Sequence, residues 1–162
     1  MGNSLLKKIA IGTAQFGMEY GIANNNGKIE KKEVINILNF AYKQGIDTID
    51  TAKVYGNSEE TLGSYISKHP DKSWNIITKV NKGGVKLKTQ IDDSIRKLNI
   101  LPCTVLAHSV SDYLDTEFYK ELDRLKRIAG VQKIGVSVYT MDDIEKVLAT
   151  KTPDVIQCPL NI

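Results

Sequence analysis

The segment GIDTID, residues 45–50, is a short strand-like run that ends in a carboxylate. Three similar runs follow it along the chain: WNIITK at 74–79, TVLAH at 104–108 and KIGVS at 133–137. The four runs end in polar residues that stand 29 positions apart: Asp50, Lys79, His108 and Ser137. A fixed interval of this kind indicates a repeated strand–helix unit. In a ring of parallel strands these side chains would meet at one rim, where such a set of acid, base and donor groups indicates catalysis.

Strand and helix patterns alternate over the whole chain. We predict six strands, at residues 8–13, 46–51, 74–80, 103–108, 133–139 and 155–158. We also predict five helices. Three span residues 31–44, 89–99 and 115–129, one begins at an N-cap at Ser58, and one follows an N-cap at Thr140. The strands are nearly continuous apolar runs, which is typical of a parallel sheet covered on both faces.

An open doubly wound sheet and a (β/α)8 barrel both fit this alternation. No G-x-G-x-x-G motif follows the first strand, and the equal spacing of functional groups on successive strands favours the barrel. The predicted fold is therefore α/β, a parallel (β/α) barrel of the TIM type that is incomplete, with about six of the eight strands. We expect residues 1–162 to form a single domain, truncated at its C-terminal end, whose two unpaired apolar sheet edges favour self-association.

The composition is that of an ordinary globular protein, with 41% hydrophobic and 25% charged residues. The net charge of +3 is too small to indicate a nucleic-acid partner, and no apolar stretch approaches the ~20 residues of a membrane span. Cys103 and Cys158 lie far apart in apolar runs, which favours two buried thiols over a disulfide or a metal site. These features predict a cytoplasmic protein without a bound metal.

A lysine within an apolar strand is costly to bury without a partner. Lys79 is such a residue, and Asp50 has the matching phase on the neighbouring strand. A protonated lysine lowers the pKa of a nearby phenol, and Tyr55 follows Asp50 in the next loop. Tyr55 would then be a proton donor near neutral pH, and His108 would orient a substrate carbonyl through a hydrogen bond.

The residues around these positions resemble the aldo-keto reductases. The matching pieces occur in order over the whole chain: Ile11-Gly12-Thr13, Ile49-Asp50-Thr51-Ala52, Tyr55-Gly56, Ser58-Glu59, Ile77-Thr78-Lys79, Leu106-Ala107-His108 and Ile134-Gly135-Val136-Ser137. The segment with Tyr55 and the Ser-Glu pair is specific, whereas the other pieces are informative as an ordered set. The resemblance implies a (β/α)8 barrel that reduces aldehydes and ketones to alcohols with NADPH, or with NADH, and that needs no metal.

The resemblance also implies a role for each matching residue. Tyr55 would be the general acid, Asp50 and Lys79 the pair that tunes it, and His108 the residue that orients the carbonyl. The positions that would contact the cofactor are Gly12, Thr13, Asp50, Ser137 and Gln157, of which Ser137 and Gln157 would hold the nicotinamide carboxamide.

The chain departs from the family pattern in three ways. Val138 stands where the family usually has Asn, and Leu160 stands where it often has an aromatic ring that stacks on nicotinamide. In the family, strands seven and eight make much of the contact with the adenosine and phosphate end of the cofactor. These two strands are absent from residues 1–162. We therefore expect weakened cofactor binding.

Other interpretations stay open. The chain could be a non-catalytic cofactor-binding or regulatory module, or an inactive fragment of a reductase. Taken singly, Asp50 could cap a loop at a strand end, and His108 could be a structural histidine. Lys82, in the loop after the third strand, could attract an anionic substrate, but a flexible solvated loop is the preferred interpretation.

Overall fold

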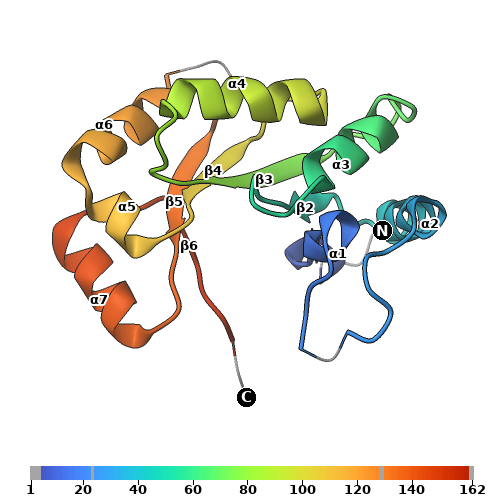
Figure 1. The fold of residues 1–162 in the computed structure, drawn as a ribbon, viewed down its shortest axis with the longest axis horizontal. Coiled ribbons are helices and arrows are strands. Elements are labelled where there is room, and N and C mark those ends of the chain that lie inside the picture. Colours follow the sequence, from blue (N-terminus) through green and yellow to red (C-terminus); the bar gives the residue numbers. More distant parts are fainter. Residues whose placement is uncertain (1–4, 23, 128–129, 161–162) are drawn as a thin grey trace. The chain divides into compact units, whose positions relative to one another are not determined.

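The computed structural model describes residues 5–22, 24–127 and 130–160, in which strands and helices alternate along the chain (Figure 1). The strands are β1 (Ala10–Gly12), β2 (Thr48–Asp50), β3 (Asn75–Val80), β4 (Thr104–Ala107), β5 (Lys133–Ser137) and β6 (Val155–Gln157). The helices are the 3-10 turn η1 (Leu6–Lys8), α1 (Ala14–Gly17), α2 (Lys31–Lys43), α3 (Ser58–Ile66), α4 (Leu87–Leu98), α5 (Val110–Leu114), α6 (Thr116–Leu125) and α7 (Met141–Thr150).

The strands form one sheet in the order β1-β2-β3-β4-β5-β6, which is their order in the sequence. The pairs β1–β2, β2–β3, β4–β5 and β5–β6 all run parallel. Each strand therefore returns to the next through a helical connection, as parallel pairing requires. This arrangement confirms the predicted fold class, an incomplete α/β barrel of the TIM type.

The chain divides into two compact units. The first contains the residues as far as Ile77, together with Ser94–Leu101, and the second contains Thr78–Asp93 and the residues from Pro102 onward. In the first unit, the inner faces of α2 and α3 and the buried strand residues form one apolar core: Phe16, Val34, Leu38, Ile49, Leu62, Tyr65, Ile66, Trp74, Ile76 and Leu98. This core supports β1 and β2, whose ends carry candidate site residues.

In the second unit, β5 contacts β4 on one side and β6 on the other, and α5 and α6 also contact it. The strands and helices of this unit bury apolar side chains: Val105, Leu106, Tyr113, Phe118, Leu122, Leu125, Ile134, Val136 and Val147. α7 begins with a capping box, in which Thr140 accepts from the amide of Asp143 while the Asp143 carboxylate accepts from the amide of Thr140. The predicted N-cap at Thr140 is thus confirmed.

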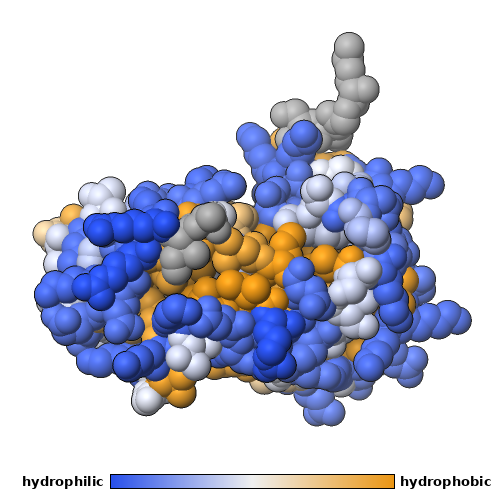
Figure 2. Space-filling model, turned by 90° about the horizontal axis from the view of Figure 1, so that it is seen from above, coloured by the Kyte–Doolittle hydropathy of each residue, from blue (hydrophilic) through white to orange (hydrophobic). Residues whose placement is uncertain are grey.

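The surface carries both polar and apolar residues. Hydrophilic residues cover much of the face shown in Figure 2, and hydrophobic residues are also visible on it. Exposed large apolar side chains include Tyr20, Phe40, Val54 and Leu160. Among the described helices, none is long and apolar enough to cross a bilayer.

Three sequence predictions need correction. The N-cap of α3 is Asn57, and the hydroxyl of Ser58 instead bonds to Thr13. The predicted helix at 115–129 ends as α6 at Leu125, with Asp115 as its N-cap; residues 128 and 129 lie outside the described part of the chain. Cys158 is exposed, so the two free cysteines are not a pair of buried thiols.

Candidate active site

The four polar residues with the 29-residue spacing lie at the carboxyl ends of their strands. Asp50 is the last residue of β2 and Ser137 the last residue of β5, while Lys79 is the penultimate residue of β3 and His108 directly follows β4. The carboxyl ends of parallel strands are where (β/α) barrels build their sites. Asp50 belongs to the first compact unit, and the other three residues belong to the second.

In the first unit, Asp50 is held by the end of β1. Gly12 is the register partner of Asp50 across the β1–β2 pair. The next residue, Thr13, is fully buried, and both its amide and its hydroxyl donate to the Asp50 carbonyl, at 3.1 and 2.9 Å. Three of the predicted site residues, Gly12, Thr13 and Asp50, therefore lie together. The Thr13 hydroxyl donates to the backbone of Asp50. The predicted contact of Thr13 with a cofactor stays a prediction.

A buried hydroxyl network holds the loop that carries Tyr55. The Ser58 hydroxyl donates to the carbonyl and hydroxyl oxygens of Thr13, at 3.0 and 2.9 Å, and the Thr51 hydroxyl donates to Ser58 at 3.2 Å. The Tyr55 amide donates to the Ala52 carbonyl and the Ser58 amide donates to the Tyr55 carbonyl, each at 3.0 Å. Tyr55 thus lies in a turn that is anchored at both ends.

Two glycines bring α1 against this turn. A Cβ at Gly17 would lie 1.8 Å from the Tyr55 carbonyl oxygen, and a Cβ at Gly56 would lie 2.3 Å from the Gly17 carbonyl oxygen. Gly56 also has a φ of +56°, a conformation that favours glycine. The backbone beside Tyr55 is therefore packed too closely for any side chain at these two positions.

In the second unit, Lys79 and His108 lie on hydrogen-bonded chain segments. The His108 amide donates to the carbonyl of Val80, the residue after Lys79, at 2.8 Å. Lys79 is only 3% exposed, and His108 is half-buried. A lysine buried in an apolar strand requires compensation for the loss of water around its charge.

Ser137 and Gln157 are register partners across the β5–β6 pair, also in the second unit. Ser137 is buried at 7% exposure, and the amide of Val138 donates to the carbonyl of Gln157 at 2.9 Å. A hydroxyl and a side-chain amide thus lie side by side at the same end of two strands. Such a pair offers the donors and acceptors that a carboxamide group requires.

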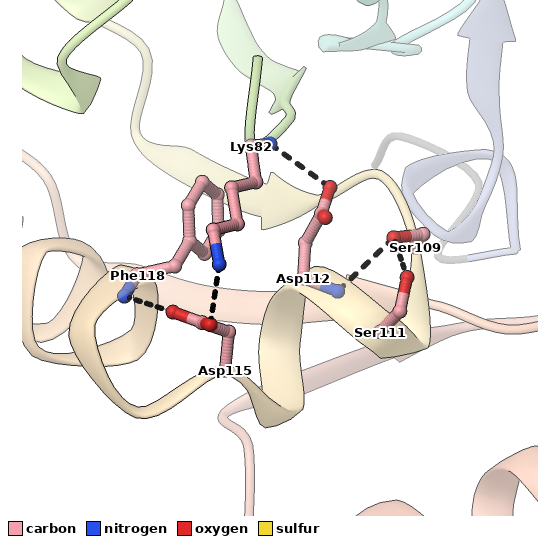
Figure 3. Close-up of polar contacts among 6 residues, drawn as sticks. All are labelled: Lys82, Ser109, Ser111, Asp112, Asp115 and Phe118. Atoms are coloured by element: carbon pink, nitrogen blue, oxygen red, sulfur yellow. Dashed lines mark hydrogen bonds and ion pairs between the residues drawn. The ribbon is translucent and has the colours of Figure 1, made fainter. Parts of the chain in front are cut away.

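A polar cluster fixes the loop that follows Lys79 (Figure 3). The Lys82 amide donates to Asp112 at 3.0 Å, and the Lys82 ammonium donates to Asp115 at 2.5 Å. Asp115 also accepts from the amide of Phe118 at 2.9 Å, which makes it the N-cap of α6. The hydrogen bond from Lys82 and that from the Phe118 amide lower the pKa of Asp115, and Asp115 raises the pKa of Lys82. Lys82 is exposed in a loop, as predicted, and its ammonium also forms an ion pair with Asp115.

The residues that support the candidate site residues could not be identified from the sequence patterns. The sequence signal for α5 was present, since Ser109 caps it by accepting from the amide of Asp112 three residues on. The partnership of Lys82 with Asp115 spans 33 residues and has no periodic signal. The Gly17–Gly56 contact likewise joins distant segments, so neither glycine stood out from the others.

Taken together, the first unit presents a carboxylate and a phenol, and the second presents a buried ammonium and an imidazole. These are groups for transferring and stabilising protons. In the described part of the chain, no group of three or more His, Cys, Asp or Glu side chains could hold a metal ion. Carboxylate, phenol, amine and imidazole groups can each take part in acid–base chemistry.

Two curated proteins are similar to this chain. The chain is 28% identical over 149 residues to the NAD/NADP-dependent indole-3-acetaldehyde reductase of Schizosaccharomyces pombe, covering 88% of this chain and 50% of that protein. It is 31% identical over 125 residues to the D-arabinose 1-dehydrogenase of Saccharomyces cerevisiae, covering 67% of this chain and 37% of that protein. The chain thus spans half or less of the length of these relatives.

A solved structure has the same fold. The aldo-keto reductase of Klebsiella pneumoniae in complex with NADPH superposes with a TM-score of 0.68 at 22% identity, covering 88% of this chain and 49% of that one. The model of the Aldo/keto reductase family matches residues 8–162, which is nearly the whole chain. The chain therefore belongs to the aldo/keto reductase family.

Proposed function

We propose that this protein reduces an aldehyde or ketone to an alcohol by hydride transfer from NAD(P)H, with Tyr55 as the proton donor. The observation that carries the proposal is the burial of Lys79 at the carboxyl end of an apolar strand, next to the residue that binds the His108 amide. A buried ammonium requires a counter-charge, and Asp50, at the end of β2, is the partner that we propose.

The proposed acid–base chemistry uses four side chains. Asp50 keeps Lys79 protonated, and the ammonium of Lys79 favours the phenolate form of Tyr55. The Tyr55 hydroxyl then gives its proton to the carbonyl oxygen as the carbon accepts a hydride, and solvent restores that proton afterwards. His108 donates a hydrogen bond that orients the carbonyl. The turn around Tyr55, anchored by Ser58 and Thr13, supports this role because a general acid must be held within hydrogen-bond reach of its substrate.

The proposed cofactor is NADPH, with NADH as the alternative, and when bound it would supply the hydride. The pairing of Ser137 with Gln157 supports a carboxamide site, and Gly12, Thr13 and Asp50 are the proposed first-loop contacts. The name of the S. pombe relative includes both NAD and NADP, and the K. pneumoniae structure holds NADPH. Val138 cannot supply the side-chain amide that the family usually has next to Ser137.

Turnover tests the proposal directly. We expect the chain to oxidise NADPH in the presence of aldehydes, and Tyr55→Phe to slow this oxidation by about 10²–10⁴-fold, the usual contribution of general acid catalysis. Tyr42→Phe is the matched control, because it removes a tyrosine hydroxyl that accepts from the backbone amide of Ser73, away from Tyr55 in the sequence. Equal rates for the wild type and Tyr55→Phe would remove Tyr55 from the mechanism.

A second candidate is a cofactor-binding module without turnover. The two candidates differ in a titration with NADPH followed by the fluorescence of Trp74, the one tryptophan of the sequence. Saturable binding without oxidation of any carbonyl compound would support the binding module. Saturable binding with Tyr55-dependent oxidation would support the reductase.

A further inference from the structure

We propose that a cavity between α2 and α3 binds a small aromatic carboxylate. The cavity has a volume of about 150 Å³, and all of its lining residues belong to the first compact unit. They lie in α2, in α3 or within three residues of the ends of α3. The described lining residues include neither Tyr55 nor a strand residue, so the inference does not depend on the proposed function.

The cavity has an apolar inner surface. Val34 and Tyr65, which line it, are only 1% and 3% exposed, and Ile35 lies beside Val34 on the same helix. An apolar cavity of about 150 Å³ can hold a benzene ring. The volume and the lining therefore fit a ligand with a single six-membered ring, whose burial would remove apolar surface from water.

Two stacked rings give the cavity a flat side. The centroids of the Tyr65 and His69 rings lie 4.2 Å apart, with an angle of 26° between their planes. His69 donates from Nδ1 to the Tyr65 carbonyl at 2.8 Å, since a carbonyl oxygen only accepts. The Tyr65 hydroxyl donates to the side-chain oxygen of Asn39 at 2.8 Å. Because both rings are held by hydrogen bonds, a flat aromatic ligand could pack on them without first ordering them.

The charges around the cavity favour an anion. Lys31 and Lys68 both line it, and within the described part of the chain neither ammonium forms an ion pair. The acidic residue Glu60 also lines the cavity, but its carboxylate is paired with Lys97 at 3.0 Å. Two ammonium groups are therefore available to a ligand carboxylate, and the carboxylate of Glu60 is already neutralised.

Binding of three small probes, measured by calorimetry without any nucleotide, tests the inference. Benzoate has both the ring and the charge, benzamide has the ring alone, and cyclohexanecarboxylate has the charge without a flat ring. We expect benzoate to bind saturably and with the lowest Kd of the three. The methyl NMR signal of Ile35, assigned from its loss in Ile35→Val, should shift on addition of benzoate because an aromatic ring lies next to it.

A double variant tests the charge. Lys31→Gln combined with Lys68→Gln should raise the Kd of benzoate about threefold to tenfold, the size expected for two exposed ion pairs, and leave that of benzamide within about twofold. Lys32→Gln combined with Lys43→Gln is the matched control. It removes the same charge from exposed positions of α2 that are not among the lining residues, and it should change neither Kd by more than about twofold.

A second variant tests the location. Ser64 is exposed and lines the cavity, so Ser64→Trp should fill the space and abolish the binding of benzoate and of benzamide. Ser67→Trp is the control, because Ser67 is exposed just after α3 and is not a lining residue. Thermal melting shows whether each variant folds, and the double lysine variant still decides the question if Ser64→Trp does not.

Four results would overturn the inference. The first is that benzoate does not bind saturably, and the second is that benzamide or cyclohexanecarboxylate binds as tightly as benzoate. The third is an equal effect of the two double lysine variants. The fourth is unchanged benzoate binding in folded Ser64→Trp, which would place the carboxylate elsewhere on the chain.

Discussion

The hydroxyl of Thr13 donates to the backbone carbonyl of Asp50 at 2.9 Å, and the same hydroxyl accepts from Ser58. One buried threonine therefore links the carboxyl end of β2 to the turn that contains Tyr55. Side chains far apart in the sequence act here as a single support, and losing any one of them leaves the others with unmet hydrogen bonds.

Thr13→Val tests this support, because valine keeps the shape of threonine and removes its hydroxyl. We expect the free energy of unfolding to fall by about 1–3 kcal/mol, since Ser58 and the Asp50 carbonyl lose a buried partner. Urea denaturation measures the change. Thr150→Val is the control, because the Thr150 hydroxyl is exposed and donates to a carbonyl of its own helix. A loss no larger for Thr13→Val than for Thr150→Val would contradict the role of the network.

Gly56→Ala should disturb the Tyr55 turn more than most glycine substitutions. The new Cβ would meet the Gly17 carbonyl oxygen at 2.3 Å, and the φ of +56° is unfavourable for alanine. We expect a loss of stability of at least about 2 kcal/mol in urea denaturation. Gly83→Ala is the control, because its Cβ would have no neighbour closer than 3.6 Å and its φ is not positive. We expect that variant to stay within about 0.5 kcal/mol of the wild type.

The Lys82–Asp115 pair should make the free energy of unfolding depend on pH under acidic conditions. The hydrogen bonds from Lys82 and the Phe118 amide lower the pKa of Asp115 in the folded protein, so the unfolded chain binds the proton more readily. The contribution of Asp115 is therefore present above its unfolded pKa and is lost as the pH falls below about 4.

Thermal melting over this pH range, comparing wild type with Asp115→Asn and Asp115→Ala, checks the prediction. Asparagine keeps the N-cap of α6 but removes the charge, so its melting temperature should converge with that of the wild type at low pH. Alanine removes both the charge and the N-cap, so Asp115→Ala should have a lower melting temperature than Asp115→Asn at every pH. Parallel curves for the wild type and Asp115→Asn would show that the carboxylate charge contributes nothing.

We also propose that the chain self-associates through the edges of its sheet. In the described residues, the sheet order ends at β1 on one side and β6 on the other, and exposed strand edges favour pairing with further strands. Sedimentation velocity should show a concentration-dependent increase in mass, and Ile156→Lys, which puts a charge on β6, should weaken it. Phe40→Lys removes an exposed apolar ring from α2 and is the control. An equal effect of both changes would indicate general hydrophobic association rather than edge pairing.

The strands could be predicted from the sequence because burial on both faces leaves a local mark, an apolar run such as WNIITK that ends in a polar residue. The residues around Ser58 could not, because two roles compete there. Local chemistry made Ser58 an N-cap candidate, but Asn57 takes that position and the Ser58 hydroxyl turns inward to Thr13. A local rule for helix ends cannot foresee a partner 45 positions away.

In the candidate site too, some residues could be predicted from the sequence and others could not. The 29-residue interval identified the strand ends at Asp50, Lys79, His108 and Ser137, since it is a property of the repeated unit. The contacts between loops, such as Lys82 with Asp115, depend on where the connections fold and carry no period.

The amide hydrogen of His108 gives an independent way to watch one pair of candidate residues. It is bound to the Val80 carbonyl, so its exchange with deuterated solvent requires this part of β3 and β4 to separate. A slow exchange rate would mean that the backbone segments that carry His108 and Lys79 rarely separate. Following that one proton in the presence and absence of a nicotinamide nucleotide would show whether the ligand tightens this part of the sheet, even in a chain that turns over nothing.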